Sequence, residues 1–203
     1  MVDHPLARTR LTAMRDTRTD SAAFRAALHE LTTMLVYEAA RSLAVEQYSI
    51  ETPVAPTTGH RVANPPLLVP VLRAGLGMSD AALALLPEST MGFVGLARDE
   101  ETHQPRAYLE SLPVDLSGQP VIVLDPMLAT GNSAIAAVRR VKATVPRSIR
   151  FVCLLTCPEG LEHFHREHPD VPVYTAAIDS HLNDHGYIVP GLGDAGDRLF
   201  GTK

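Results

Sequence analysis

A polar turn at residues 125–133 carries the residue types that bind the phosphate of a sugar. It reads Asp-Pro-Met-Leu-Ala-Thr-Gly-Asn-Ser and follows an apolar run at residues 121–124 that predicts a buried strand. The pattern after the turn predicts a helix, whose first N–H groups and positive dipole end favour an anion. Thr130 and Ser133 add hydroxyl donors there, and Gly131 lets the backbone approach a ligand closely.

Asp125 narrows the choice of ligand, because a carboxylate at the start of this turn would repel a phosphate alone. Ribose hydroxyls, in contrast, would donate hydrogen bonds to Asp125, so a phosphorylated sugar fits the turn best. Asn132 tolerates a left-handed backbone conformation better than most residues. The alternative is an ordinary strand, turn and helix capped by Thr130. The turn is not a Walker A loop, since Gly-Lys-Ser/Thr is missing at the required spacing.

A second turn of similar design follows the apolar run at residues 67–72. Arg73 stands directly after the run, and Gly75 and Gly77 leave backbone N–H groups accessible before the next helical pattern. If the two strands are neighbours, both turns lie at the sheet edge where ligands of open α/β folds bind. An arginine beside a helix cap also has a purely structural interpretation. The two turns together favour a sugar ligand that also carries a diphosphate.

The third candidate segment runs from His185 to Thr202 and contains glycines at positions 186, 191, 193, 196 and 201. Together with Pro190, these glycines argue against a regular helix or a long strand. The segment also contains Tyr, Ile, Val, Leu and Phe, which predicts a packed loop rather than a frayed tail. Backbone groups of such a loop are suited to bind a small planar molecule through hydrogen bonds.

The elements that must position these turns alternate between strands and helices, which predicts an α/β fold with a mostly parallel sheet and helices on both faces. A long amphipathic helix is expected at residues 21–43, begun by Asp20 or Ser21. Residues 51–66 read as a loop or hairpin, and residues 99–118 as a flap that leaves the sheet. We expect one domain over residues 1–203, with a small hood built from this flap and the C-terminal loop. The remaining expected elements are strands at 67–72, 91–96, 120–124, 149–155 and 171–178, and helices at 77–86, 132–144 and 159–167.

The composition favours a globular enzyme over a disordered chain or a general nucleic-acid binder. Of the 203 residues, 45% are apolar, and the net charge is −5 with scattered Lys and Arg. A nucleic-acid-binding protein usually carries a basic face. The N-terminus lacks a secretory signal pattern, and no apolar run reaches the roughly 20 residues that span a bilayer. Cys153 and Cys157 are interpreted as buried thiols rather than a disulfide or metal site, as expected in the cytoplasm.

His163, His165 and His168 lie close together in one predicted helix. Their spacing does not place all three on one face, so we interpret them as part of a solvated helix face rather than a metal site. The acidic residues 99–101 beside Arg98 are likewise interpreted as a solvated part of the flap. Closure of such a flap would exclude water from an activated sugar.

Four motifs make the chain resemble the uracil phosphoribosyltransferase family, which has the type I phosphoribosyltransferase fold. The resemblance extends over nearly the whole chain, from His4-Pro-Leu to the final Phe-Gly-Thr-Lys. It implies a pentosyltransferase of pyrimidine salvage that converts uracil and 5-phosphoribosyl 1-diphosphate (PRPP) to UMP and diphosphate with Mg²⁺. The motifs are Leu72-Arg-Ala-Gly-Leu-Gly, Arg98-Asp-Glu-Glu-Thr, Leu124-Asp-Pro-Met-Leu-Ala-Thr-Gly and Gly186-Tyr-Ile-Val-Pro-Gly-Leu-Gly-Asp-Ala-Gly-Asp.

The resemblance also implies a role for each matching residue. Arg73 and Arg98 would lie beside the diphosphate, Asp125 beside the ribose, and Asp194 beside the phosphoribosyl ligand, and these four form the catalytic set. Mg²⁺ would be held mainly by PRPP and water, without dedicated protein ligands. Uracil would be bound largely through main-chain groups of Ile188, Gly193, Asp194 and Ala195. The implied PRPP-binding residues are Arg73, Arg98, Asp125, Pro126, Met127, Leu128, Ala129, Thr130, Gly131, Asn132, Ser133 and Asp194.

The chain departs from the family pattern at two places. Asn132 stands where the family usually has the second glycine of Ala-Thr-Gly-Gly. Ala97 and Asp99 flank Arg98, where the family tends to have an aromatic residue and Asn. Neither change removes one of the implied contacts, so we expect an effect on affinity rather than loss of the reaction.

Partners other than the substrates follow from the resemblance alone. Family members are commonly dimers or tetramers and some respond to GTP, so a homodimer or homotetramer and a GTP effector are candidates. Neither a nucleic acid nor a membrane is expected as a partner. Two alternatives are an RNA-binding pyrimidine regulator on the same fold and a phosphoribosyltransferase for another base. The scattered cations argue against the first, and the C-terminal loop argues against the second.

Overall fold

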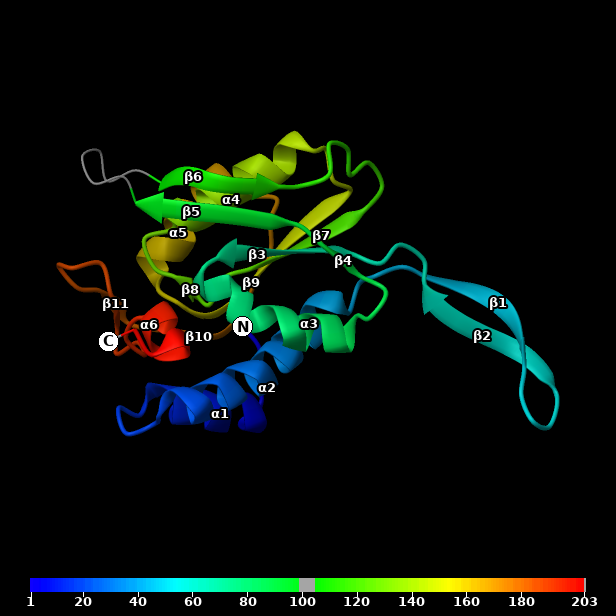
Figure 1. The fold of residues 1–203 in the computed structure, drawn as a ribbon, viewed down its shortest axis with the longest axis horizontal. Helices are drawn as coiled ribbons and strands as arrows, with labels where there is room; N and C mark the ends of the chain where they lie inside the picture. The colour runs from blue at the N-terminus through cyan, green and yellow to red at the C-terminus, as the bar shows by residue number, and fades with distance from the viewer. Residues whose placement is uncertain (99–104, 203) are drawn as a thin grey trace.

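The computed structural model describes residues 1–98 and 105–202, and its centre is a mostly parallel sheet (Figure 1). Strands β10, β9, β7, β3 and β5 are parallel neighbours, and β6 pairs antiparallel with β5 at one edge. Two short strands, β4 (Thr90–Met91) and β8 (Met127–Leu128), pair with β3 and β9. The main strands, in sheet order, are β10 (Val173–Ile178), β9 (Ser148–Thr156), β7 (Pro120–Leu124), β3 (Leu67–Leu72), β5 (Phe93–Arg98) and β6 (Pro105–Ser111).

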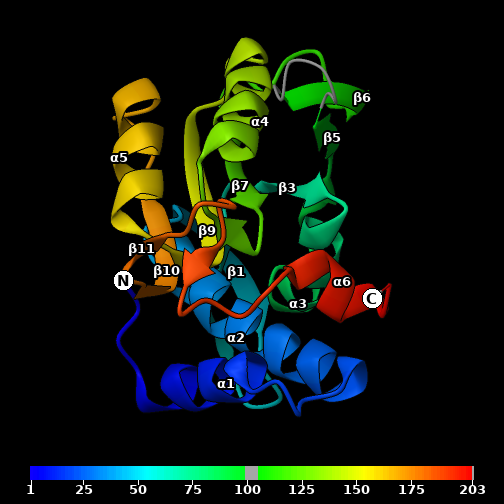
Figure 2. The same ribbon diagram turned by 90° about the vertical axis from the view of Figure 1, so that its left-hand side faces the viewer.

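Helices cover both faces of this sheet, as Figures 1 and 2 show. On one face lie α4 (Asn132–Ala143) and α5 (Pro158–Glu167), and on the other lie α1 (Pro5–Arg15), α2 (Ser21–Ala40) and α3 (Ser79–Leu85). The predicted α/β fold with a mostly parallel sheet is therefore confirmed.

The central strand β7 shows why an unbroken apolar run suits this position. All five of its residues are buried. Val121 and Val123 contribute to the core beneath α4, whereas Ile122 and Leu124 contribute to the core beneath α2. Successive side chains of a strand point to opposite faces, so a strand covered on both sides needs apolar residues throughout. The strand thereby fixes the position of the polar turn that follows it.

The N-terminal part of the chain is more helical than expected. Helix α2 begins at Ser21, with the Asp20 side chain accepting a hydrogen bond from the N–H of Ala23, as predicted, but it ends at Ala40. Helix α1 was not expected, because only three of its eleven residues are buried. The predicted loop or hairpin is a hairpin of β1 (Val45–Glu51) and β2 (Pro56–Val62) that projects from the body (Figure 1).

Two expectations about the hood are wrong in part. The flap expected at residues 99–118 does not leave the sheet throughout, because β6 pairs along β5 as its edge strand. The C-terminal segment contains a regular helix, α6 (Ala195–Phe200), in addition to the short strands β11 (His181–Leu182) and β12 (Ile188–Val189). Asp194 caps α6 and Gly201 ends it in the left-handed conformation, so a helix of six residues tolerates Gly196.

Cys153 and Cys157 are buried free thiols, as predicted. Burial raises the pKa of the Cys153 thiol to about 12. In the part of the chain that the structure describes, no helix combines the length and apolar character that crossing a bilayer requires.

Candidate functional site

The two predicted turns meet at one edge of the sheet. Strands β3 and β7 are parallel neighbours, with Pro70 opposite Leu124 at their carboxyl ends. Gly75 lies so close to the end of β7 that a Cβ atom there would stand 2.4 Å from the Leu124 carbonyl oxygen. The turn that begins at Arg73 therefore packs directly against the residue that precedes Asp125, and the expected adjacency is confirmed.

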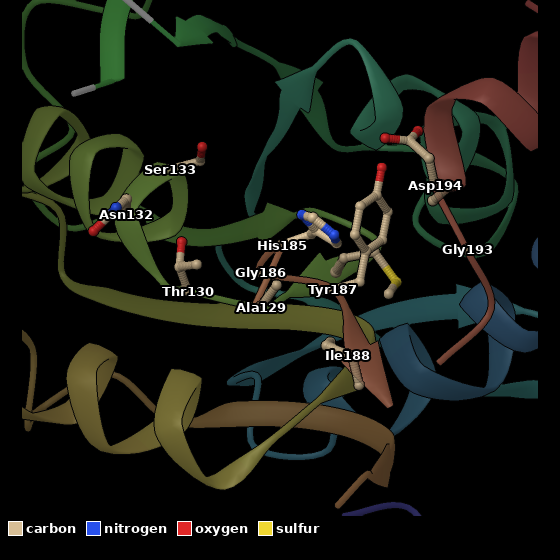
Figure 3. A pocket seen from close by; sticks show the side chains of 12 residues that line it. Ala129, Thr130, Asn132, Ser133, His185, Gly186, Tyr187, Ile188, Gly193 and Asp194 are labelled. Atoms are coloured by element: carbon tan, nitrogen blue, oxygen red, sulfur yellow. The ribbon is translucent and has the colours of Figure 1, made fainter. Parts of the chain in front are cut away.

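A pocket of about 390 Å³ opens at this edge, between the turn after β7 and the C-terminal segment. Figure 3 shows Thr130, Asn132 and Ser133 on one side, Gly193 and Asp194 on the other, and residues 185–188 between them. Met127, Ala129 and Ala195 complete the lining. The structure thus brings together segments that are more than fifty residues apart in the sequence.

The start of α4 forms one end of this pocket. Gly131 is the N-cap residue and has a φ of 85°, in the left-handed region that favours glycine. The predicted alternative, in which Thr130 caps the helix, is not observed, because no side chain caps α4. Asn132 and Ser133, the first two residues of the helix, line the pocket. The N–H groups of an uncapped first turn are therefore placed to bind a phosphate.

Asp125 lies directly after β7 and is half-buried. Burial raises the pKa of its carboxyl group to about 7, and a hydrogen bond from the backbone of Met127 opposes this shift. A carboxylate in such surroundings gains from donors or cations that a ligand brings, because burial penalises its charged form. Hydroxyl groups of a sugar are donors of this kind.

The two arginines of the expected catalytic set lie at the carboxyl ends of neighbouring strands, Arg73 just after β3 and Arg98 as the last residue of β5. Arg73 is exposed and begins the short 3₁₀ helix η1 (Ala74–Met78) after β3. Arg98 is the last residue of β5, which pairs with β3 through Leu72 and Gly95. The acidic residues 99–101 fall outside the described residues, together with the rest of segment 99–104.

The C-terminal segment supplies the other end of the pocket. Gly193 is exposed with a φ of 81°, and the exposed Asp194 uses one carboxylate oxygen to accept from the N–H of Asp197. Ala195 and Ile188 also line the pocket, although both residues are buried. All four residues expected to bind uracil line this pocket.

Some expected residues support the site without lining the pocket. The Pro126 carbonyl accepts a hydrogen bond of 2.9 Å from the N–H of Leu154, and the Leu128 carbonyl accepts from the Thr156 hydroxyl. Gly131 is buried. These three residues hold the path of the turn.

Three pocket residues were missed, although their sequence segment was singled out. His185, Gly186 and Tyr187 line the pocket between its two ends (Figure 3). A Cβ atom on Gly186 would stand 3.5 Å from the Thr130 methyl group, so the C-terminal segment closely approaches the turn after β7. The sequence signal that could have identified them was a histidine and a tyrosine at the start of the glycine-rich segment.

The interpretation of the three histidines as a solvated face is wrong for two of them. His168 is buried, with Nε2 3.1 Å from the Ile135 carbonyl oxygen, and burial lowers its pKa. Nδ1 of the half-buried His163 lies 2.8 Å from the Thr130 carbonyl oxygen, whereas His165 is exposed. The reason is that Phe164 anchors α5 in the core, which turns the neighbouring side chains towards α4 and its preceding turn.

The sequence is similar to curated proteins along its whole length. A model of the uracil phosphoribosyltransferase family matches residues 1–202. The chain is 53% identical over 203 residues to a uracil phosphoribosyltransferase of Corynebacterium diphtheriae, which covers all of this chain and 96% of the relative. It is also 53% identical over 204 residues to a uracil phosphoribosyltransferase of Myxococcus xanthus, with 100% and 97% covered.

Solved structures show the same fold. The AQ2163 protein of Aquifex aeolicus superimposes with a TM-score of 0.93 at 36% identity, covering 98% of this chain and 96% of that chain. A hypoxanthine-guanine phosphoribosyltransferase of Bacillus anthracis has a TM-score of 0.52 at 15% identity, covering 77% of this chain and 78% of that chain, which shows a shared fold alone. Given the family match and the full-length relatives, this chain belongs to the uracil phosphoribosyltransferase family.

Proposed function

We propose that the chain transfers the 5-phosphoribosyl group of PRPP to uracil, giving UMP and diphosphate in pyrimidine salvage. Membership of the uracil phosphoribosyltransferase family supports this reaction. The observation that carries it is the single pocket in which the start of α4 faces Gly193, Asp194 and Ala195. This cavity suits a nucleotide, because the start of a helix at one end favours a phosphate and the backbone groups of a loop at the other end favour a base.

The ribose 5-phosphate would lie at the start of α4. Thr130 and Ser133 would donate through their hydroxyls, and the N–H groups near Gly131 and Asn132 would complete the anion site. Asp125 would accept hydrogen bonds from the ribose hydroxyls. Because Asn132 replaces the usual glycine, its side chain lies at the edge of this phosphate site and would affect PRPP affinity.

The diphosphate would lie at the carboxyl ends of β3 and β5, where Arg73 follows β3 and Arg98 is the last residue of β5. Guanidinium groups form strong charge-assisted hydrogen bonds with phosphate oxygens. The exposed position of Arg73 leaves its side chain room to reach a ligand above the sheet. Both arginines would neutralise the charge that grows on the leaving diphosphate.

Uracil would be bound through the main chain of Ile188, Gly193 and Ala195, with Asp194 beside the sugar. Gly193 exposes its backbone at a positive φ, which leaves its polar groups unobstructed by a side chain. Tyr187 lines the same pocket and offers an aromatic surface to a planar base.

The reaction breaks the bond between C1 of ribose and the diphosphate oxygen and forms a bond to N1 of uracil, which loses its proton. Positive charge develops on the ribose ring and negative charge on the diphosphate. The residues described above would therefore act by orienting two substrates and stabilising separated charge, without a covalent intermediate on the protein.

Magnesium fits this site as a partner of the substrate. Among the described residues, no three His, Cys, Asp or Glu side chains gather as a metal site, so PRPP and water would provide most of the ligands. Asp125 is the half-buried carboxylate beside the sugar position, and its raised pKa would fall next to a cation. Bound Mg²⁺ would supply charge stabilisation for the diphosphate.

The reaction is tested by incubating the purified chain with uracil, PRPP and Mg²⁺ and separating the nucleotides by chromatography. We expect UMP and diphosphate in equal amounts, and no nucleotide when PRPP or Mg²⁺ is omitted. Cytosine, orotate, hypoxanthine and a short RNA serve as comparison ligands. Absence of UMP, or a stronger reaction with another base, would overturn the proposed substrate.

We also propose that residues 1–203 act as one cytoplasmic domain within a homodimer or homotetramer. The two free buried thiols agree with a reducing compartment, and exposed apolar residues such as Val45 and Val54 on the projecting hairpin agree with self-association. Light scattering tests the assembly. GTP remains a candidate effector from family resemblance, and its addition to the UMP assay tests activation.

A further inference from the structure

Side chains of β9, of α5 and of Cys157 between them contact three successive carbonyl groups of the turn after β7. The Thr156 hydroxyl donates to the Leu128 carbonyl oxygen at 2.9 Å. The Cys157 thiol lies 3.7 Å from the Ala129 carbonyl oxygen, and Nδ1 of His163 lies 2.8 Å from that of Thr130. Each of these carbonyl groups therefore points towards the start of α5.

The start of α5 also approaches the turn too closely for any side chain at one position. A Cβ atom on Gly160 would stand 2.1 Å from the Ala129 carbonyl oxygen and 2.7 Å from that of Leu128. Backbone meets backbone there, so neither segment can shift alone. The Thr130 carbonyl is farther along the turn, next to α4, and its partner is the His163 side chain.

The direction of these carbonyl groups determines where the N–H groups point. In a trans peptide, the C=O of one residue and the N–H of the next point in opposite directions. With the carbonyl groups of Leu128, Ala129 and Thr130 turned towards α5, the N–H groups of Ala129, Thr130 and Gly131 point away from α5. Ala129 and Thr130 both line the pocket.

We propose that His163 is a positioning residue, which holds the Thr130 carbonyl so that the N–H of Gly131 faces the 5-phosphate of the sugar ligand. This inference rests on the proposed phosphoribosyl site. A carbonyl oxygen only accepts, so Nδ1 of His163 carries the hydrogen in this contact. Orientation of the peptide between Thr130 and Gly131 before binding lowers the reorganisation that binding requires.

His163 acts without touching the ligand. It borders a separate cavity lined by α4 and α5, beside Arg139 and Glu167, and it is absent from the lining of the substrate pocket. An effect of substituting His163 on phosphate binding would therefore be transmitted through Thr130. The neighbouring His165 is exposed on the same helix and provides a matched control.

The test compares His163→Ala, His163→Asn and His163→Gln by calorimetric titration with ribose 5-phosphate. The Asn amide nitrogen replaces Nδ1, whereas the Gln amide nitrogen replaces Nε2. We expect roughly three- to tenfold weaker binding for the Ala and Gln variants, the effect of one net hydrogen bond. Binding by His163→Asn and by the control His165→Ala should stay near that of the wild type.

Turnover gives a second measurement. The KM for PRPP should rise in His163→Ala and recover in His163→Asn, while the KM for uracil stays constant in both. Unchanged affinity of His163→Ala for ribose 5-phosphate, or no recovery in His163→Asn, would overturn the positioning role. Wild-type binding of ribose 5-phosphate without UMP formation would instead reject the proposed reaction and leave the role of His163 intact.

Discussion

The guanidinium group of Arg15 and the carboxylate of Asp179 form two hydrogen bonds, with N–O distances of 2.7 and 2.5 Å, that join α1 to the C-terminal segment. The same two side chains hold both polar backbone groups of Gly191. Arg15 donates to the Gly191 carbonyl at 2.8 Å, and the Gly191 N–H donates to Asp179 at 2.9 Å. Gly191 lies between Ile188 and Gly193, so the pair fixes the loop proposed to bind uracil.

Removal of this carboxylate should weaken both folding and base binding. In Asp179→Ala, Arg15 loses its partner and the Gly191 N–H loses its acceptor, which should lower the free energy of unfolding by roughly 3 kcal/mol. The KM for uracil should rise more than the KM for PRPP. Denaturant unfolding and steady-state kinetics measure both effects.

A matched control is Asp170→Ala, since Asp170 pairs with Lys142 on the surface with its side chain 65% exposed. An exposed pair of this kind contributes less than about 1 kcal/mol. Equal losses in the two variants would contradict the special role of Asp179.

Asp125→Asn should keep the fold and lose most turnover. Asn has the size of Asp but loses one strong acceptor for the ribose hydroxyls, so kcat/KM should fall roughly a hundredfold. Circular dichroism checks the fold and the UMP assay checks the rate. Wild-type turnover in this variant would disprove the ribose assignment.

The raised pKa of Asp125 also predicts a dependence of stability on pH. The folded protein binds a proton at Asp125 with a pKa of about 7, compared with 3.8 for an ordinary Asp. Between these values the folded state holds more protons than the unfolded chain, so rising pH lowers the free energy of unfolding. Asp125→Asn should remove this part of the decline between pH 4 and pH 7 in denaturant titrations. An identical pH profile in both proteins would contradict the pKa shift.

Gly75→Ala should disturb both turns together. The new Cβ atom would stand 2.4 Å from the Leu124 carbonyl oxygen, so backbone must move. We expect a loss of roughly 1–3 kcal/mol in stability, as for other overpacked positions, and a larger relative loss of UMP formation. Leu76→Ala in the same turn, where the leucine is 47% exposed, is the control and should have little effect on stability. Equal behaviour of the two variants would argue against the close contact.

Arg73→Ala should slow the reaction without unfolding the protein. Loss of a group that stabilises the developing charge on diphosphate typically costs roughly 100- to 1,000-fold in rate. The exposed position of Arg73 predicts a stability change within about 0.5 kcal/mol. Arg139→Ala, a change at an exposed arginine paired with Glu167, controls for loss of positive charge. A small rate effect in Arg73→Ala would remove it from the catalytic set.

The sequence predicted the turn from Asp125 to Ser133 well, because its signals are local. A buried strand on both faces must be apolar throughout, and β7 has the predicted bounds of 120–124. The proximity of Arg73 and Asp125 followed from a general rule, since parallel neighbours end at the same edge. The glycine-rich segment by itself predicted main-chain binding of a small planar molecule, and only family resemblance identified that molecule as uracil.

Other features depend on contacts that have no local signal. His163 binds a carbonyl group 33 residues earlier in the chain, and only the packing of α5 against the turn reveals it. Helix α6 forms because Asp194 caps it and Leu199 packs against the turn at Gly77, which outweighs the low helix propensity of Gly196. Strand β6 pairs with the strand that precedes it, but its polar, proline-containing sequence did not predict a strand.

The C-terminal segment from Asp179 to Phe200 lies beside the main sheet and is held by Arg15, Arg198 and a helix cap. The residues proposed to bind the sugar phosphate belong instead to the end of β7, the turn after it and the start of α4. Under the proposed assignments the two parts of the site are separately mutable. Substitutions at residues 179–200 other than Asp194 should change the affinity for the base more than the affinity for PRPP.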